Sequence, residues 1–356
     1  MRCPFEPPIR ASRRKGSIVR NIINRLFMGN KKYTEEDAAG VDPLPTPGVS
    51  DGAADTVPAA AGPMPAADEQ TISAPLPALP EELPATTPLA APPPSRAPRI
   101  HAVQRCHVGA VRPRNEDSAL TFVGETGGQS PLLPFSMYIV ADGMGGHFAG
   151  HDASRRVSRL VAAHLMQQIY LPLLREKDGV NQKPVQEIML EAVQAANREI
   201  HNPDPFKETG TTLTAAVILG RRLYLAHVGD SRAYLLRDRA LKLLTTDHSY
   251  VQRLQDAGQL TPEEAATHPQ RNVLYRAVGQ GGELEVDVST SALPASGQLL
   301  LCSDGLWGLV AEDVITDVLE DAALSPDAKV DRLVELALRG GGHDNITAIL
   351  VSFSLA

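Results

Sequence analysis

Positions 138–147 read YIVADGMGGH, in which aromatic and β-branched residues run directly into Asp142, Gly143 and a glycine-rich turn. Runs of this kind are typical of buried strands, and an Asp-Gly pair is a common strand end. Positions 299–305, LLLCSDG, repeat the arrangement, with Asp304 after the apolar residues. The two stretches predict two buried strands that each end in a carboxylate.

The C-terminal part of the chain contains further short strand-like and helix-like patterns. Apolar, β-branched runs predict strands at 135–141, 213–219, 223–228, 233–236, 299–302 and 347–353. Apolar residues at helical spacing predict helices within 153–169, 185–200, 251–257 and 330–338. The break at 220–222 is short enough for a hairpin, so at least one strand pair is antiparallel. The patterns predict an α+β domain with an antiparallel sheet.

Other carboxylates also stand next to predicted strands. Asp230 follows an apolar run, Asp344 precedes the last predicted strand, and Glu116 and Asp117 are adjacent. A single Asp-Gly pair is most often only a turn, but a charge at the rim of a core must be solvated, hydrogen-bonded or neutralised. Hard oxygen ligands without clustered cysteines suit Mg²⁺ or Mn²⁺ rather than zinc. The repeated placement predicts a divalent-cation site.

Composition divides the 356-residue chain, whose net charge is -8, into three parts. Residues 1–33 carry a net charge of +8 and form a basic N-terminal segment. Residues 34–98 have no aromatic residue and, from position 41 on, hold 15 of the 29 prolines, which predicts a disordered Pro/Ala-rich linker. Residues 99–356 suit one domain. Its acidic balance argues against nucleic-acid binding.

The sequence favours a cytoplasmic protein. Three scattered cysteines are too few for a disulfide framework. We find no apolar run of about 18 residues, the length that a membrane-spanning helix needs. The basic N-terminus has an interrupted apolar part and is a poor secretory signal.

The N-terminal segment contains a possible amphipathic helix within 12–33. Ser17 suits an N-cap and Gly29 a C-terminal stop. Two apolar rows at i, i+4 spacing form one face, which comprises Ile18, Val19, Ile22, Ile23, Leu26 and Phe27. Its basic flanks suit an anionic membrane surface or an acidic partner groove, and the alternative is a solvated basic tail.

Seven motifs occur in one order along the predicted domain. They are R-x-x-NED (112–117), VADGMGGH (140–147), GTT (210–212), VGDSR (228–232), TDHS (246–249), SDGLW (303–307) and DNIT (344–347). Together they resemble the motif set of the bacterial PP2C-type (PPM family) metal-dependent protein serine/threonine phosphatases. The resemblance also covers residues 248–279, including the run THPQRN (267–272), which resembles the flap segment near the active site of bacterial members. The resemblance implies a four-layer α-β-β-α sandwich of two antiparallel sheets flanked by helices.

The resemblance also implies a metal site. Asp142 would bridge two metals, Glu116 and the Gly143 carbonyl would hold one of them, and Asp304 and Asp344 would hold the other. The implied cofactors are two tightly bound Mn²⁺ or Mg²⁺ ions, with a third, weaker ion. We expect the carboxylates to be weakly ordered without cations, because like charges repel one another.

Further roles follow from the same resemblance. Asp117 would hydrogen-bond metal-bound water, Asp230 together with Asp304 would form the third, weaker metal site, and Arg112 would hold the substrate phosphate. In eukaryotic relatives a histidine follows the Asp-Gly pair as the proposed general acid. Met144 stands there in this chain, so His147 becomes the candidate, and its alternative is a packed histidine at the start of a helix.

The activity that these roles imply is metal-dependent hydrolysis of phosphoserine and phosphothreonine in proteins by a metal-bridged water. The implied partners are phosphorylated protein substrates, and a bacterial member would oppose eukaryotic-like Ser/Thr kinases and act on their targets. We expect a monomer.

Two alternatives remain at the level of sequence. The run CHVGAVR at 106–112 fits C-x-x-G-x-x-R, the phosphate loop of cysteine-dependent phosphatases, with Cys106 as the nucleophile. The neighbouring Arg105 and Pro113 are atypical of that loop, and 103–111 alternates like a strand. The second alternative is a catalytically inactive phosphoprotein-binding module of the same fold. Such a module would lack a metal ligand, and no expected ligand is missing.

Overall fold

The computed structural model describes residues 99–125, 133–145, 148–175, 183–201 and 209–355. The predicted basic segment 1–33, the predicted linker 34–98 and the candidate acid His147 lie outside the described residues.

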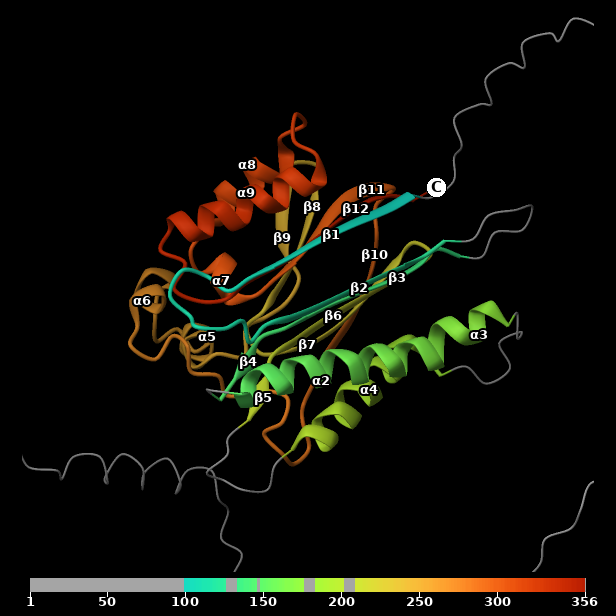
Figure 1. Ribbon diagram of the computed structural model, residues 1–356, viewed down its shortest axis with the longest axis horizontal. Helices are drawn as coiled ribbons and strands as arrows, with labels where there is room; N and C mark the ends of the chain where they lie inside the picture. Colours follow the sequence, from blue (N-terminus) through green and yellow to red (C-terminus); the bar gives the residue numbers. More distant parts are fainter. Residues whose placement is uncertain (1–98, 126–132, 146–147, 176–182, 202–208, 356) are drawn as a thin grey trace, which may run out of the picture. The chain divides into compact units, whose positions relative to one another are not determined.

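Two five-stranded antiparallel sheets form the centre of the domain (Figure 1). The order of the first sheet is β10 (Asp287–Ala292), β7 (Arg222–Val228), β6 (Leu213–Leu219), β3 (Phe135–Ala141) and β2 (Ser118–Gly124). The order of the second is β1 (Arg99–His107), β12 (Ile346–Ser354), β11 (Ser296–Cys302), β8 (Arg232–Arg237) and β9 (Ala240–Leu243). A small ladder also pairs β4 (Gly143–Met144) with β5 (Gly210–Thr211).

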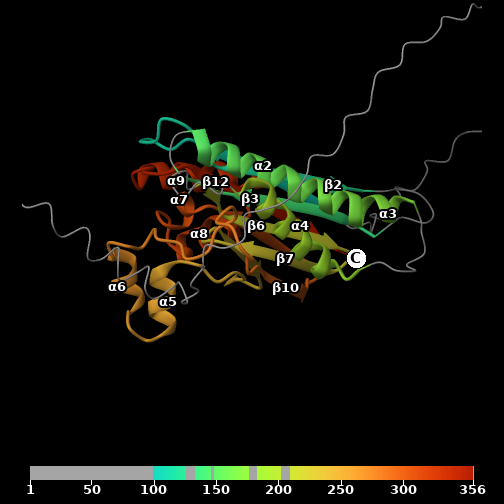
Figure 2. The same ribbon diagram turned by 90° about the horizontal axis from the view of Figure 1, so that it is seen from below.

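Helices cover the outer face of each sheet (Figures 1 and 2). The first sheet is covered by α2 (Phe148–Leu165) and α4 (Val185–Ile200), and α2 continues through a π-helical turn, η1 (Met166–Tyr170), into α3 (Leu171–Leu174). The second sheet is covered by α7 (Asp304–Trp307), α8 (Glu312–Glu320) and α9 (Pro326–Arg339). Two short helices, α5 (Tyr250–Asp256) and α6 (Pro262–Thr267), lie in the excursion between β9 and β10.

Successive side chains of the central strands point to opposite faces of their sheet, and the buried apolar residues therefore form three layers. In β3, Met137 and Ile139 pack toward α2 and α4, whereas Tyr138 and Val140 pack between the sheets. All seven residues of β3 are buried, which explains why its sequence is apolar throughout instead of alternating. In β11, Leu300 packs toward the helices of the second sheet. The observed architecture confirms the predicted α-β-β-α sandwich.

The predicted strands and helices are all present, and the hairpin at 220–222 joins β6 to β7, with Gly220 at a φ of 57°. Five strands were not predicted, namely β2, β9, β10 and the two-residue strands β4 and β5. Most of β10, with the sequence DVSTSA, is exposed, so it lacks the apolar run on which the prediction depended. Among the helices that the structure describes, none has the length and apolar character needed to cross a membrane.

Candidate active site

Strand direction brings the acidic residues to one end of the sandwich. The end of β3 lies beside the start of β2, because Ala141 pairs with Ser118 across an antiparallel ladder. The end of β11 lies beside the start of β12 in the same way, through Cys302 and Ala348. The acidic residues before β2 and β12 therefore meet those after β3 and β11.

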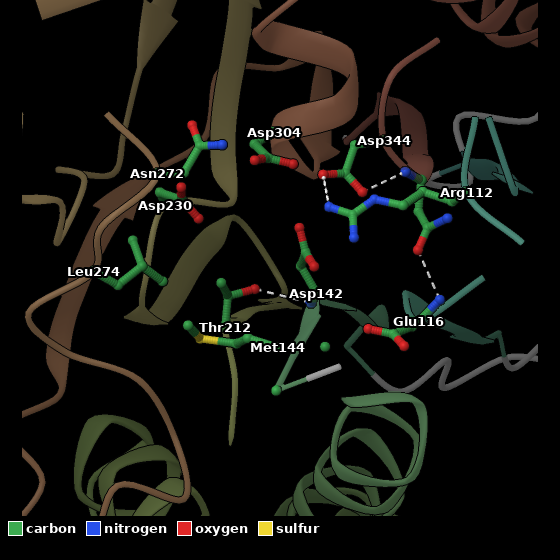
Figure 3. A pocket seen from close by; sticks show the side chains of 13 residues that line it. Arg112, Glu116, Asp142, Met144, Thr212, Asp230, Asn272, Leu274, Asp304 and Asp344 are labelled. Atoms are coloured by element: carbon green, nitrogen blue, oxygen red, sulfur yellow. Dashed lines mark hydrogen bonds and ion pairs between the residues drawn. The ribbon is translucent and has the colours of Figure 1, made fainter. Parts of the chain in front are cut away.

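A cavity of about 210 Å³ opens at this end (Figure 3). Of the expected site residues that the structure describes, Asp117 does not line it and seven do, namely Arg112, Glu116, Asp142, Gly143, Asp230, Asp304 and Asp344. Figure 3 shows Asp142 pointing toward Asp304 and Asp344. Two further lining residues, Asn272 and Leu274, come from the segment after α6. The flap resemblance predicts that this segment lies near the site, and Asn272 ends the quoted run at 267–272, whereas no motif includes Leu274.

Asp142 is held by its backbone. Its N–H donates to Thr212 Oγ1 at 2.9 Å, and its carbonyl accepts from Thr211 Oγ1 and from the Thr212 N–H, both at 2.8 Å. The Gly143 N–H donates to the Glu116 carbonyl at 3.2 Å, and a Cβ on Gly143 would lie 2.6 Å from that oxygen. The glycine is therefore required for close approach between the two acidic loops.

Asn345 orders the loop that carries Arg112 and Glu116. Its side-chain amide donates to the carbonyls of Val108 and Arg114, both at 2.9 Å, and its carbonyl oxygen accepts from the Glu116 N–H at 2.7 Å. Asn345 thus ties this loop to the start of β12, a role that its position in the DNIT motif did not reveal.

Asp117 lies behind the cavity, buried to all but 7% of its surface. One carboxylate oxygen accepts from Ser303 Oγ at 2.8 Å, and the other has no partner in the described part of the chain. Burial raises the pKa of Asp117 to about 7 and that of Asp304 to about 6, and neighbouring carboxylates add to both effects. For Asp142 and Asp230, burial followed by neighbouring carboxylates raises the pKa well above its usual range.

The Arg112 guanidinium neutralises only part of the negative charge of these carboxylates. Its Nη2 atom lies 2.6 Å from Asp344 Oδ2, and this hydrogen bond raises the pKa of the guanidinium. Half of the Arg112 side-chain surface is exposed, so the group can reach both Asp344 and a molecule in the cavity mouth.

The donor set fits a hard divalent cation. The Asp304 carboxylate also has one buried oxygen without a hydrogen-bond partner among the described residues, and such an atom is costly unless a cation or proton satisfies it. The cavity offers carboxylate and carbonyl oxygens and no cysteine or histidine within the described ranges. No three acidic, histidine or cysteine side chains there are gathered closely enough to hold an ion as they stand.

Trp307 and Arg232 support Asp230 from the second sheet. Trp307 Nε1 donates to the Asp230 carbonyl at 3.0 Å, and the Arg232 guanidinium lies 3.7 Å from the centre of the Trp307 ring. Arg232 also forms a bidentate ion pair with Asp247. The SDGLW motif did not reveal this role of Trp307, because a hydrogen bond to a distant backbone carbonyl leaves no local pattern.

Cys106 is a residue of strand β1, as the alternation at 103–111 predicts, and it pairs with Thr347 of β12. Its surroundings raise the pKa of the thiol, mainly by desolvation, whereas a thiolate nucleophile requires a lowered pKa. Cys106 does not line the cavity described above, and Arg112 turns toward Asp344 instead. The C-x-x-G-x-x-R match therefore does not form a phosphate loop.

A family profile described as Protein phosphatase 2C matches residues 117–337. The chain belongs to this family. It is 38% identical to the serine/threonine phosphatase stp of Listeria welshimeri over 256 residues, which cover 72% of this chain and 97% of that protein. It is 40% identical to the serine/threonine protein phosphatase PstP of Mycobacterium tuberculosis over 247 residues, or 68% of this chain and 43% of that protein.

Solved structures of PP2C-family phosphatases share the fold. The S. agalactiae serine/threonine phosphatase superimposes with a TM-score of 0.60 at 34% identity and covers 71% of this chain and 99% of its own. The catalytic domain of PstP in complex with two manganese ions gives a TM-score of 0.56 at 35% identity, with 72% and 99% covered. The family resemblance and the fold predicted from the motifs are confirmed.

Beneath the PP2C site lies a fully buried histidine, His227, in β7. Its Nε2 lies 3.1 Å from the Thr246 carbonyl, and its Nδ1 lies 3.0 Å from Thr214 Oγ1. Burial, followed by the nearby His248, lowers the pKa of His227 from 6.5 to about 3. The ring is therefore neutral in the folded protein at any pH at which the domain is expected to be stable.

The buried His227 ring predicts a loss of stability in mild acid. Below about pH 6.5 the His227 ring binds a proton in the unfolded chain but not in the folded one. Its contribution to the free energy of unfolding is therefore fully present above pH 6.5 and is lost as the pH falls toward 3. The loss between pH 7 and 5 is about 2 kcal/mol. His227→Gln removes the titrating group but keeps an N–H donor. As the pH is lowered from 7 to 5, the free energy of unfolding of this variant, measured by urea denaturation, should therefore fall less steeply than that of the wild type. Parallel profiles would contradict this assignment.

Proposed function

We propose that this PP2C-family chain is a divalent-metal-dependent phosphatase that hydrolyses phosphoserine and phosphothreonine esters in proteins. The observation that carries the proposal is the carboxylate-lined cavity with an arginine at its mouth, in a chain of this family. Relatives that are 38–40% identical are named serine/threonine phosphatases, which supports the substrate class. The catalytic domain of PstP with two manganese ions supports the cofactor class.

The residues that would hold the cations are those around the cavity. Figure 3 shows Asp142 between Glu116 on one side and Asp304 and Asp344 on the other, and the Gly143 carbonyl would join Glu116. Asp230 would contribute to a third, weaker site. When bound, Mn²⁺ or Mg²⁺ polarises the phosphoryl group and lowers the pKa of water.

The chain's own groups have separate tasks. Arg112 binds phosphate oxygens with its planar guanidinium, exchanging its contact with Asp344 for the substrate. Ser303 donates a hydrogen bond to one carboxylate oxygen of Asp117 and so fixes the group. The other oxygen, which has no partner among the described residues, would accept a hydrogen bond and orient its donor. His147 is the proposed proton donor to the leaving alkoxide, because Met144 cannot transfer a proton. The small cavity admits the phosphorylated side chain and leaves the rest of the substrate protein outside.

We propose that the segments N-terminal to the catalytic domain direct the enzyme to its partners. We propose the boundaries 1–33 for a basic segment, 34–98 for a linker and 99–356 for the catalytic domain of a monomeric, cytoplasmic enzyme. The 256-residue match to the Listeria phosphatase is close to the length of the proposed domain. The basic segment would contact an anionic membrane or an acidic partner, and a Ser/Thr kinase and its targets are the proposed phosphoprotein partners.

Hydrolysis of p-nitrophenyl phosphate and of a phosphothreonine peptide should require added Mn²⁺ or Mg²⁺. Asp142→Asn should lower kcat at least about a hundredfold, or about 2.7 kcal/mol, because it removes the central carboxylate. Circular dichroism should show an unchanged fold. Asp238→Asn, in the exposed β8–β9 turn, is the matched control and should retain wild-type activity. Activity that survives exhaustive chelation would refute the proposal.

Arg112 and Cys106 should differ in their effect on the same assay. Arg112→Ala should raise KM more than it lowers kcat, because it removes a phosphate-binding fork. Cys106→Ser should retain most activity, because the thiol lies in a strand away from the cavity lining. Complete loss of turnover in a folded Cys106→Ser protein would instead favour the thiol mechanism.

Deleting residues 1–98 should leave kcat and KM on p-nitrophenyl phosphate within about twofold, because a long linker uncouples the two ends of the chain. A peptide of residues 12–33 should gain helical circular dichroism on anionic vesicles and remain coil on neutral ones. Impaired metal-dependent turnover of the truncated protein would show that the boundary is misplaced, and a peptide that stays coil on both vesicles would exclude the membrane contact.

A further inference from the structure

His248 is a buried residue of the TDHS motif to which neither the metal site nor the phosphate site gives a role. It is 1% exposed and makes two hydrogen bonds to Gly229, the residue before Asp230. The Gly229 N–H donates to His248 Nδ1 at 3.0 Å, and the His248 N–H donates to the Gly229 carbonyl at 2.7 Å. His248 therefore holds both backbone polar groups of Gly229, which belong to the two peptide units on either side of its Cα.

The bond from Gly229 determines the protonation of the ring. A backbone N–H can only donate, so Nδ1 is unprotonated and Nε2 carries the hydrogen. Nε2 donates to Asp287 Oδ2 at 3.2 Å, and Arg276 Nη1, which lies 3.1 Å from Nε2, donates to the other oxygen of that carboxylate at 3.0 Å. Burial lowers the pKa of His248, which favours this neutral ring. Asp287 belongs to β10, so the ring is anchored to the first sheet.

The same residue stands at the base of the segment that carries α5 and α6. The Tyr275 N–H donates to the His248 carbonyl at 3.0 Å, and Ser249 and Leu274 form a β-bridge. Leu274 and its neighbour Asn272 line the cavity. Both ends of this excursion therefore meet at His248, on the side of the cavity where Figure 3 shows Asp230, Asn272 and Leu274.

Gly229 is confined on its other side as well. Its φ is 108°, and a Cβ there would lie 2.6 Å from the side chain of Thr212, the residue that holds the Asp142 backbone. Asp230, which follows, is buried near Asp304, a like charge that repels it. A carboxylate in this position needs a rigid backbone, because repulsion would otherwise move it away from the cavity.

We infer that His248 is a positioning residue that fixes Gly229, and through it the Asp230 carboxylate, relative to the cavity edge formed by Asn272 and Leu274. The inference rests on the proposed function of Asp230 in the third metal site. His248 touches neither substrate nor cation, so its effect is on where Asp230 is held and not on the chemistry itself.

The test compares two substitutions in the full-length chain. His248→Asn keeps an acceptor at the place of Nδ1 and loses the contact with Asp287, whereas His248→Ala loses both. In chelated protein, exchange of the Gly229 amide measured by NMR should be at least about tenfold faster in His248→Ala than in the wild type, the loss expected for one buried hydrogen bond. The exchange in His248→Asn should stay within about threefold of the wild type.

Metal activation supplies the second measurement. The Mn²⁺ concentration that gives half-maximal hydrolysis of p-nitrophenyl phosphate should rise at least about tenfold in His248→Ala and by less than about threefold in His248→Asn. Val330→Ala, a cavity-forming substitution in the core of α9, serves as the control for general destabilisation and should leave this concentration unchanged. If His248→Ala does not fold, His248→Gln, whose longer side chain can reach Asp287 but offers no acceptor at the place of Nδ1, takes its place and should raise this concentration at least about tenfold.

Two results would overturn the positioning role. One is a wild-type Mn²⁺ curve for folded His248→Ala, and the other is equal impairment of His248→Ala and His248→Asn. A wild-type protein without any Mn²⁺-dependent hydrolysis would instead refute the proposed function, and the exchange of the Gly229 amide would still decide whether His248 holds this loop.

Discussion

Repulsion among buried carboxylates is the constraint on which the rest of this structure depends. Asp117, Asp142, Asp230 and Asp304 lie at one end of a double sheet, and burial raises the pKa of each. A chain does not gain stability from such an arrangement. The two packed sheets, with three apolar layers, provide the burial energy that offsets this cost. The site is thus a charged rim on an otherwise apolar framework.

The backbone around the rim is held by neutral hydrogen bonds. Thr212 holds Asp142, Asn345 holds the loop before β2, and Trp307 and His248 hold the two sides of the Asp230 turn. None of these side chains brings a further negative charge to the cavity. Each of these bonds goes to the backbone of an acidic loop and does not occupy its carboxylate. The carboxylates therefore remain available to a cation that enters the site.

Membership in the PP2C family and the cavity point to the same chemistry from independent observations. The family match depends on the sequence of 117–337, whereas the convergence of acidic strand ends is a property of the fold. Arg112 lies outside the matched range and still reaches the cavity, where it pairs with Asp344. An arginine beside a carboxylate cluster suits a substrate that is itself an anion, which is consistent with relatives named serine/threonine phosphatases.

Local sequence patterns predict the strands with strong apolar runs, such as β3 and β6, and the acidic residues at their ends, because burial and turn formation are local in sequence. The ordered motifs also identified the family, and with it the sandwich. Exposed β10 and the short α6 were missed, since neither carries an apolar period. The polar residues that support the site can be recognised only from the packed fold. Asn345, Trp307 and His248 act through backbone groups that are distant in the chain, and such contacts depend on strand order and packing, which leave no spacing rule in the sequence.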